Sequence, residues 1–263
     1  MAQATPQYSA IRYEERDGVA QVTLNRPDAA NTLNHALSTE LLDALIRAEE
    51  NTAVRALVIT ATGRFFCAGA DLKSFYGAAD ELKNRVSYFH VAISRIVRAP
   101  FPVIGAINGT AAGGGMGLAC ACDLLIAAES AKFVMAYTRR GLTPDGTTTY
   151  FLPRRIGIGR AIELAYLNRT LTAREALDWG IVNQVVPDAE LAGATAAMAA
   201  QLAKGATRAF AAAKRLMHQG FNESLETQIE SELRSIYEMA GTDDTKEAIR
   251  AFNEKREPVF KGR

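Results

Sequence analysis

Short apolar segments alternate with amphipathic helical patterns through the first half of this 263-residue chain, and this alternation most constrains its fold. Strands are predicted at residues 19–24, 56–60, 103–107 and 124–127, and helices at residues 34–50 and 80–97. The segment 56–60 is apolar at nearly every position, which is typical of a strand covered on both faces of its sheet. Strand–helix alternation of this kind predicts βαβ units and a mostly parallel sheet.

The second half of the chain is predicted to be helical, with no further strands after about residue 150. A capping box from Thr172 to Glu175 opens a helix that ends at Gly180, because both side chains can satisfy backbone N–H groups at the helix start. Further helical patterns cover residues 188–204, 206–219, 222–240 and 244–256. We therefore predict an α/β core over residues 1–195 and a helical oligomerisation region over residues 196–263.

Charge and cysteine content exclude several classes of protein. The 30 basic and 29 acidic side chains give a net charge of +1, which argues against a broad nucleic-acid or membrane-binding surface. A small basic site for a phosphorylated ligand remains compatible with this balance. Cys67, Cys120 and Cys122 lack zinc-site spacing, so we expect buried thiols in a reducing compartment. Without a secretory signal pattern or an apolar stretch of roughly 20 residues, the chain is expected to be soluble and cytoplasmic.

A glycine-rich segment follows the strand predicted at 103–107 and precedes an apolar helical pattern. Residues 107–117 read INGTAAGGGMG. Glycines let a ligand approach the backbone, and the first N–H groups of a helix have no partner within it, so an anionic oxygen could bind there. The Walker and dinucleotide-binding patterns are both absent. Close packing of the helix on the sheet explains the glycines equally well.

A second loop, residues 63–72, follows the strand predicted at 56–60. Gly69 can turn the backbone so that the Ala70 N–H points away from the sheet, while Asp71 can cap the next helix. Taken alone, a packed turn between strand and helix is the simpler interpretation. Two N–H donors from separate loops could instead form an oxyanion hole, which stabilises negative charge on a carbonyl oxygen.

Together the two loops carry a resemblance to a known family. Residues 66–72 (FCAGADL) and 108–117 resemble the two signature loops of the crotonase (enoyl-CoA hydratase/isomerase) family. The match extends over nearly the whole chain, through residues 25–27, 131–133, 176–182 and 252–256. The resemblance implies the ClpP/crotonase-like fold, an α/β fold of repeated ββα units with a helical C-terminal trimerisation layer.

The resemblance also implies an activity and partners. It indicates a homotrimer or a dimer of trimers that binds an acyl-CoA thioester. The backbone N–H groups of Ala70 and Gly114 are then expected to hold enolate-like charge on the thioester oxygen. No metal and no cofactor beyond the coenzyme A of the substrate is implied, and neither nucleic acid nor membrane is an expected partner.

Two departures from the family pattern bear on the reaction. Family hydratases carry glutamates at positions that hold Gly117 and Tyr137 here, and neither residue can deliver water as a carboxylate does. Simple enoyl hydration is therefore not expected. Asp145 is the carboxylate offered instead. By itself its Pro-Asp-Gly segment indicates a turn whose aspartate caps the next helix, whereas the same loop faces the acyl group in this family.

Two subfamilies with an aspartate at this position remain open. One resembles the ring-opening isomerases of phenylacetate breakdown, in which case Asp145 moves a proton between carbons of the acyl chain. The other resembles 4-chlorobenzoyl-CoA dehalogenase, in which case Asp145 attacks an aromatic carbon and His90 activates water. That dehalogenase positions its aspartate with a tryptophan, where this chain has Tyr137. His90 is equally well explained as a residue on the inner face of its helix, and a non-catalytic acyl-CoA-binding protein is a third interpretation; we favour the isomerase.

The predicted coenzyme A contacts come from three parts of the chain and are Arg26, Arg64, Ala68, Leu72, Phe252 and Lys255. Arg26 lies where family members place a cation for the phosphates. Phe252 and Lys255, on the final predicted helix, are expected to reach the ligand of a neighbouring subunit. Any single surface cation is more often a solvated charge than a ligand contact.

Overall fold

A six-stranded sheet forms the centre of the computed structural model, which describes residues 7–71 and 79–263. Its strand order is β1-β2-β3-β5-β7-β10, and every neighbouring pair is parallel except the hairpin of β1 with β2. The predicted mostly parallel sheet is therefore confirmed. The strands are β1 (Ile11–Arg16), β2 (Val19–Leu24), β3 (Ala56–Ala61), β5 (Val103–Ile107), β7 (Leu124–Ala128) and β10 (Gln184–Val186).

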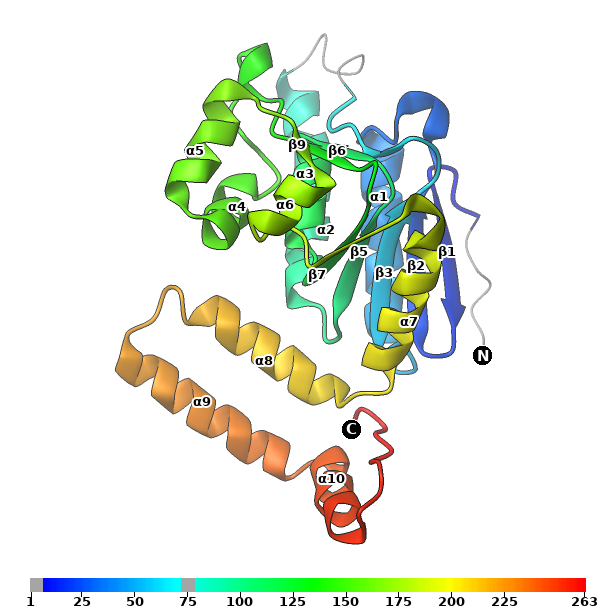
Figure 1. The fold of residues 1–263 in the computed structure, drawn as a ribbon, viewed down its shortest axis with the longest axis vertical. Coiled ribbons are helices and arrows are strands. Elements are labelled where there is room, and N and C mark those ends of the chain that lie inside the picture. The colour runs from blue at the N-terminus through cyan, green and yellow to red at the C-terminus, as the bar shows by residue number, and fades with distance from the viewer. Residues whose placement is uncertain (1–6, 72–78) are drawn as a thin grey trace.

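Helices cover both faces of this sheet, which explains why β3 is apolar at consecutive positions. Leu57 and Ile59 belong to the core that contains the apolar stripes of α1 (His35–Glu50) and α2 (Ala79–Arg98). Val58 points to the opposite face and packs in a smaller cluster with α7 (Leu191–Ala203). Figure 1 shows α7 on one side of the sheet and α1 on the other.

A second, smaller sheet carries the loops that the sequence singled out. Its order is β4-β6-β8-β9, with β9 antiparallel to β8. The strands are β4 (Phe65–Cys67), β6 (Thr110–Ala112), β8 (Lys132–Val134) and β9 (Leu171–Thr172). The prediction that strands end after about residue 150 is wrong, because β9 and β10 both lie beyond it. They span only two and three residues, which is too short for a periodic pattern.

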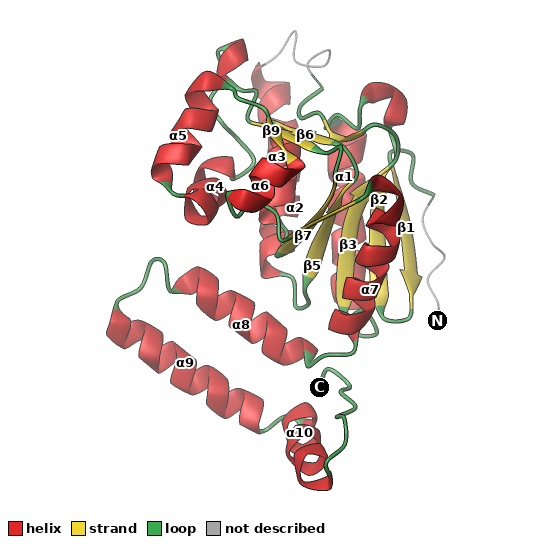
Figure 2. Ribbon diagram, in the orientation of Figure 1, coloured by secondary structure: helices red, strands yellow, loops and turns green. Residues whose placement is uncertain are grey.

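The remaining helices surround the small sheet or form a separate layer at the C-terminus (Figure 2). Near the small sheet lie α3 (Gly114–Ala121), α4 (Thr148–Ile156), α5 (Ile158–Leu167) and α6 (Ala173–Asp178), and α6 begins with the predicted capping box. Short 3₁₀ turns are η1 (Pro27–Ala29), η3 (Thr138–Arg140) and η4 (Asp188–Glu190). The C-terminal layer consists of α8 (Thr207–Gln219), α9 (Leu225–Ala240) and α10 (Asp243–Glu254). The predicted boundary at residue 195 falls within α7.

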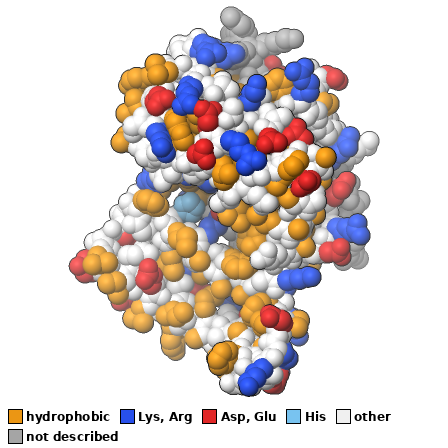
Figure 3. Space-filling view, in the orientation of Figure 1, with side chains coloured by type: hydrophobic (Ala, Val, Ile, Leu, Met, Phe, Trp, Pro, Cys, Tyr) orange, Lys and Arg blue, Asp and Glu red, His pale blue; other side chains and the backbone are white. Residues whose placement is uncertain are grey.

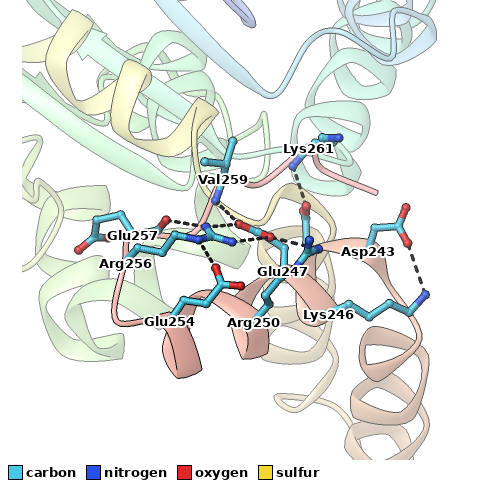
Figure 4. A network of polar contacts seen from close by, with 10 residues as sticks. Asp243, Lys246, Glu247, Arg250, Glu254, Arg256, Glu257, Val259 and Lys261 are labelled. Carbon is cyan, nitrogen blue, oxygen red and sulfur yellow. Dashed lines mark hydrogen bonds and ion pairs between the residues drawn. The ribbon is translucent and has the colours of Figure 1, made fainter.

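The C-terminal tail, residues 257–263, folds back onto α10 and is held by carboxylates of that helix (Figure 4). Asp244 is 5% exposed and accepts hydrogen bonds from the N–H groups of Lys261, at 2.6 Å, and Gly262, at 2.8 Å. Glu247 accepts from the Val259 N–H at 3.1 Å and pairs with Arg256. The tail is thereby joined to the helix that precedes it.

Arg55, next to the start of β3, joins the tail to the core. Its guanidinium donates to the carbonyl oxygens of Phe260, at 2.8 Å, and Gly205, at 2.5 Å, and its Nε donates to the Thr207 hydroxyl. One side chain of the core therefore holds both the start of the C-terminal layer and the end of the chain.

The structure also describes the three thiols, the length and polarity of the helices, and possible metal-binding groups. Cys67, Cys120 and Cys122 are free and buried, as predicted. Among the helices of residues 7–71 and 79–263, none is both long enough and apolar enough to cross a membrane. The same residues contain no group of three or more His, Cys, Asp or Glu side chains placed to hold a metal ion.

Candidate active site

Two glycine turns bring separate loops into backbone contact. Gly69 has φ 89° and Gly113 has φ 53°, both in the left-handed region that favours glycine. A Cβ atom on Gly69 would lie 2.8 Å from the Ala112 carbonyl oxygen and 3.3 Å from the Gly114 nitrogen. Gly114 is the first residue of α3, where backbone N–H groups have no partner within the helix. The turn at residue 69 therefore lies against a helix start that offers an unused donor.

The backbone around Ala70 directs a second N–H group to the same place. Leu33 donates to the Gly69 carbonyl oxygen at 2.8 Å and accepts from the Asp71 N–H at 3.1 Å, so residues 69 to 71 pair with it as a parallel bridge. Successive N–H groups of an extended segment point to opposite sides. The Ala70 N–H therefore points away from Leu33, and Ala70 and Gly114 both line one cavity.

This cavity, here called the acyl cavity, has a volume of about 670 Å³. Apolar side chains from α2 and from the loop after β8 form part of its wall, together with charged groups from the loop after β2. The lining residues used below are Arg26, Ala68, Ala70, Asp71, Phe89, Gly114, Tyr137, Arg140, Leu142 and Asp145. The two backbone donors and the Asp145 carboxylate thus line one cavity, which is the arrangement needed to hold a carbonyl oxygen and to move a proton nearby.

The turn that carries Asp145 is fixed through its backbone. The Asp145 carbonyl oxygen accepts from the Tyr137 hydroxyl at 2.9 Å and from the Thr148 hydroxyl at 2.8 Å. Burial raises the pKa of Tyr137, so this phenol remains a donor at neutral pH. Tyr137 therefore holds the position of the Asp145 main chain and does not touch its carboxylate.

The position of one missing hydratase glutamate is filled by this same turn. A Cβ atom on Gly117 would lie 2.4 Å from the Gly146 carbonyl oxygen and 3.1 Å from its carbonyl carbon. Gly146 has φ 59°, and a Cβ there would lie 2.8 Å from the Phe89 ring. The turn at residues 145–147 consequently packs backbone to backbone on α3, and position 117 has no room for a side chain.

His90, on α2, contacts the Asp145 carboxylate. Its Nε2 lies 2.5 Å from Asp145 Oδ1, and the two side chains are 46% and 39% exposed. Phe89, one residue earlier, is only 4% exposed and lines the acyl cavity. The described wall of that cavity does not include His90. The structure therefore brings the two predicted residues together, with the histidine behind the carboxylate.

The predicted coenzyme A contacts are divided between the cavity and more distant sites. Arg26 and Ala68 line the acyl cavity, and Arg26 Nη2 lies 3.2 Å from Asp71 Oδ2. Arg64 is exposed and lies outside the described cavity wall. Phe252 is 83% exposed on α10, and Lys255 follows that helix, in the C-terminal layer far from α3 and η1 (Figure 1). Leu72 lies outside the described residues.

The sequence did not single out several residues of the cavity wall. Phe89 belongs to the apolar stripe of α2, so the helical periodicity contained a signal for its inward position. Arg140 is the last residue of the short turn η3, and Leu142 lies in the irregular segment after it, where no periodicity indicates a direction. Arg140 donates to the Ala136 carbonyl oxygen at 3.1 Å, which places its guanidinium beside the cavity.

The family is decided by comparison with known sequences. The model of the family described as Enoyl-CoA hydratase/isomerase matches residues 14–263. The chain belongs to the enoyl-CoA hydratase/isomerase family. Both loops that form the acyl cavity lie within the matched residues, and the resemblance read from those loops is thereby confirmed.

Curated relatives in this family carry different activities in their names. A probable enoyl-CoA hydratase of Rhodobacter capsulatus is 42% identical, over 97% of this chain and 99% of its own. A 1,2-epoxyphenylacetyl-CoA isomerase of Escherichia coli is 39% identical, over 94% of this chain and 96% of its own. A 4-chlorobenzoyl coenzyme A dehalogenase of an Arthrobacter species is 35% identical, over 93% and 91%. Relatedness across the family therefore does not separate the reactions.

Solved structures confirm the predicted fold. The crystal structure of an enoyl-CoA hydratase from Bacillus anthracis is 36% identical and superposes with a TM-score of 0.93, covering 97% of this chain and 100% of that one. The chain therefore has the crotonase fold of this family, an α/β core with a helical C-terminal region.

Proposed function

We propose that this protein is an isomerase of acyl-CoA thioesters that shifts a double bond or opens a ring by proton transfer. The observation that carries the proposal is Asp145, the carboxylate on the cavity wall that includes Tyr137 and Leu142. Backbone donors from Ala70 and Gly114 line the same cavity. A carboxylate and an oxyanion hole together are sufficient to make and quench an enolate.

The reaction follows from the roles of these groups. The thioester oxygen accepts hydrogen bonds from the Ala70 and Gly114 N–H groups, which become stronger as negative charge develops on it. Asp145 removes a proton from a carbon of the acyl chain, and the electron pair of that C–H bond moves into the enolate. The carboxylic acid then returns a proton to a different carbon, which restores the thioester carbonyl. This chemistry uses no metal and no cofactor beyond the coenzyme A of the substrate.

The local structure disfavours hydration, although one relative is named a probable hydratase. Gly117 has no room for a side chain because the turn at Gly146 packs on it. Tyr137 uses its hydroxyl on the Asp145 carbonyl oxygen. Asp71 lines the cavity but contacts Arg26, 3.2 Å away. Asp145 acting as the only acid and base fits a proton shuttle between carbons better than a hydratase that must activate and add water.

Hydrolytic dehalogenation of an aryl-CoA thioester is a second candidate, favoured by one specific contact. His90 Nε2 lies 2.5 Å from Asp145 Oδ1, where a base could activate the water that cleaves an aryl ester of the aspartate. Incubation with 4-chlorobenzoyl-CoA and a chloride electrode tests it directly. Absence of chloride release removes this candidate.

We further propose that the protein acts as a homotrimer or a dimer of trimers, assembled through the C-terminal layer. Large apolar side chains are exposed along α9 and its neighbours, and hydrophobic groups cover much of this lobe in Figure 3. They include Met217, Phe221, Leu225, Ile229, Leu233, Ile236, Tyr237 and Phe252. Exposed patches of this kind mark association surfaces. In such an assembly Phe252 and Lys255 would contact a coenzyme A bound by a neighbouring subunit, with Arg26 contacting it from its own cavity.

The proposed isomerase is tested with a panel of acyl-CoA thioesters in deuterium oxide, followed by mass spectrometry. The panel includes trans-3-hexenoyl-CoA, 1,2-epoxyphenylacetyl-CoA and crotonyl-CoA as a hydration substrate. We expect isomerisation without hydration, and a loss of turnover by about 10²- to 10⁴-fold in Asp145→Asn. Ligand affinity is expected to persist in that variant because the oxyanion donors are backbone groups. Full activity in Asp145→Asn would refute the assignment, and tight binding without any conversion by the wild type would favour the non-catalytic alternative.

A further inference from the structure

A second cavity lies behind the Asp145 carboxylate, between α2, α4 and α8. It has a volume of about 820 Å³. Its histidine, basic and acidic lining residues are His90, Arg98, Lys214, Arg215, His218 and Glu223. A space of this size and polarity has ample room for water. We call it the rear cavity.

Two short segments separate the two cavities, because each contributes one residue to either side. On α2, Phe89 lines the acyl cavity and His90 lines the rear cavity. On the turn before α4, Asp145 lines the acyl cavity and Thr147 lines the rear cavity. The contact between His90 Nε2 and Asp145 Oδ1, 2.5 Å long, therefore joins the linings of the two cavities.

In an isomerase that uses the Asp145 carboxylate as its acid and base, exchange of the catalytic proton with solvent needs a second path, which this contact can supply. A bound acyl group excludes water from the acyl cavity, so the proton taken by Asp145 is shielded from solvent on that side. His90 meets the carboxylate from the other side and is 46% exposed. The imidazole has one nitrogen against the carboxylate and a second that is free to exchange a proton with water.

We propose that His90 relays protons between Asp145 and water in the rear cavity, so that the catalytic proton exchanges with solvent while substrate is bound. This inference rests on the proposed isomerase function. In the relay, the proton that Asp145 has taken from carbon passes from its carboxyl group to Nε2, and the imidazolium releases its Nδ1 proton to water. Return runs in reverse: water protonates Nδ1, the Nε2 proton passes to the carboxylate, and the acid protonates carbon. No net charge or electron is transferred.

Deuterium incorporation separates the relay from turnover. The wild type is expected to convert trans-3-hexenoyl-CoA in deuterium oxide to a product that carries solvent deuterium. In His90→Ala, the ratio of deuterium incorporated to product formed should fall by at least about tenfold, because Asp145 then returns the proton it removed. Added imidazole, which the rear cavity can admit, should restore the ratio. His35→Ala is the matched control, since His35 is an exposed histidine on α1 that lines neither cavity.

Several results would overturn the relay. An unchanged ratio in His90→Ala, an equal fall in His35→Ala, or a fall that imidazole does not reverse would each do so. If His90→Ala loses turnover entirely, the rate of exchange of the α-hydrogen of butyryl-CoA with deuterium oxide is compared between the wild type and the variant. This measurement needs no isomerisation. The two measurements also separate the two proposals. If the wild type fails to convert every isomerisation substrate, the proposed function is rejected. If the rate of α-hydrogen exchange is the same with and without His90, the relay is rejected.

Discussion

Replacing Gly117 with alanine tests whether the turn at residues 145–147 places the catalytic carboxylate. The alanine Cβ would lie 2.4 Å from the Gly146 carbonyl oxygen, about 1 Å closer than the 3.4 Å at which ordinary van der Waals contact begins. Both partners are backbone, one in α3 and one in a turn, so no side-chain rotation relieves the overlap. The turn must therefore move away from α3 by about 1 Å, and Asp145 moves with it.

The size of the effect follows from this displacement. A misplacement of about 1 Å at a reacting group costs on the order of 100-fold in rate. Overpacking costs about 1–3 kcal/mol of folding stability, but alanine regains up to about 1 kcal/mol relative to glycine within a helix. We therefore expect Gly117→Ala to remain folded, with a small loss of thermal stability and a fall in kcat of about two orders of magnitude.

The assay measures kcat for trans-3-hexenoyl-CoA together with a thermal melt followed by circular dichroism. Gly105→Ala, in β5, is a matched control because its Cβ would also lie 2.4 Å from a neighbour, here the Leu125 side chain. That variant is expected to lose stability with kcat nearly unchanged. Wild-type kcat in Gly117→Ala would refute the placement of Asp145 by the turn, and an equal loss of kcat in Gly105→Ala would attribute the effect to overpacking alone.

Two further predictions concern Tyr137 and the C-terminal tail. Tyr137→Phe removes the donor 2.9 Å from the Asp145 carbonyl oxygen, so about 1 kcal/mol of stability and a several-fold loss of kcat are expected, whereas a loss beyond 100-fold would mean that the hydroxyl acts on substrate. The Arg256 guanidinium and the Val259 N–H lower the pKa of Glu247 from 4.5 to about 2. Because a lowered carboxyl pKa stabilises the fold above the unfolded value, this contribution is complete above about pH 4.5 and is lost as the pH falls towards 2. The protection factors of the tail amides should therefore fall as the pH is lowered through this window, and in Glu247→Gln they should already be low at pH 7; a tail equally protected at pH 2.5 and pH 7 would contradict the assignment.

The parts of the fold that the sequence predicted are those with a strong periodic signal. Residues 56–60 and 103–107 are buried on both faces, and α2 carries an apolar stripe, so their types and approximate bounds could be predicted. β9 and β10 are only two and three residues long, and tertiary contacts rather than local pattern define them. The hairpin of β1 with β2 was not predicted, although the Asp17-Gly18 turn has the positive φ angles typical of such a connection.

Some features of the candidate site could likewise be predicted from local sequence, and others could not. Glycines at 69 and 113 mark the two donor loops because the positive φ angles of both turns favour glycine. The contact between His90 and Asp145 joins residues 55 positions apart, and the packing of Gly117 on Gly146 joins two different elements. Neither distance is encoded in any local pattern. The family resemblance could propose the residues of the site. The separation of the acyl cavity from the rear cavity depends instead on how α2 packs against the turn at residues 145–147.

The C-terminal tail has a consequence for how the protein is made. Asp244 and Arg55 bind backbone groups of residues 260–262, which are synthesised after every helix of the C-terminal layer. The contacts that attach α10 to the core therefore cannot form while these residues are still inside the ribosome. A nascent chain whose synthesis has not passed residue 262 lacks the contacts that hold α10 in place. The placement of α10 thus depends on a segment that is made after it.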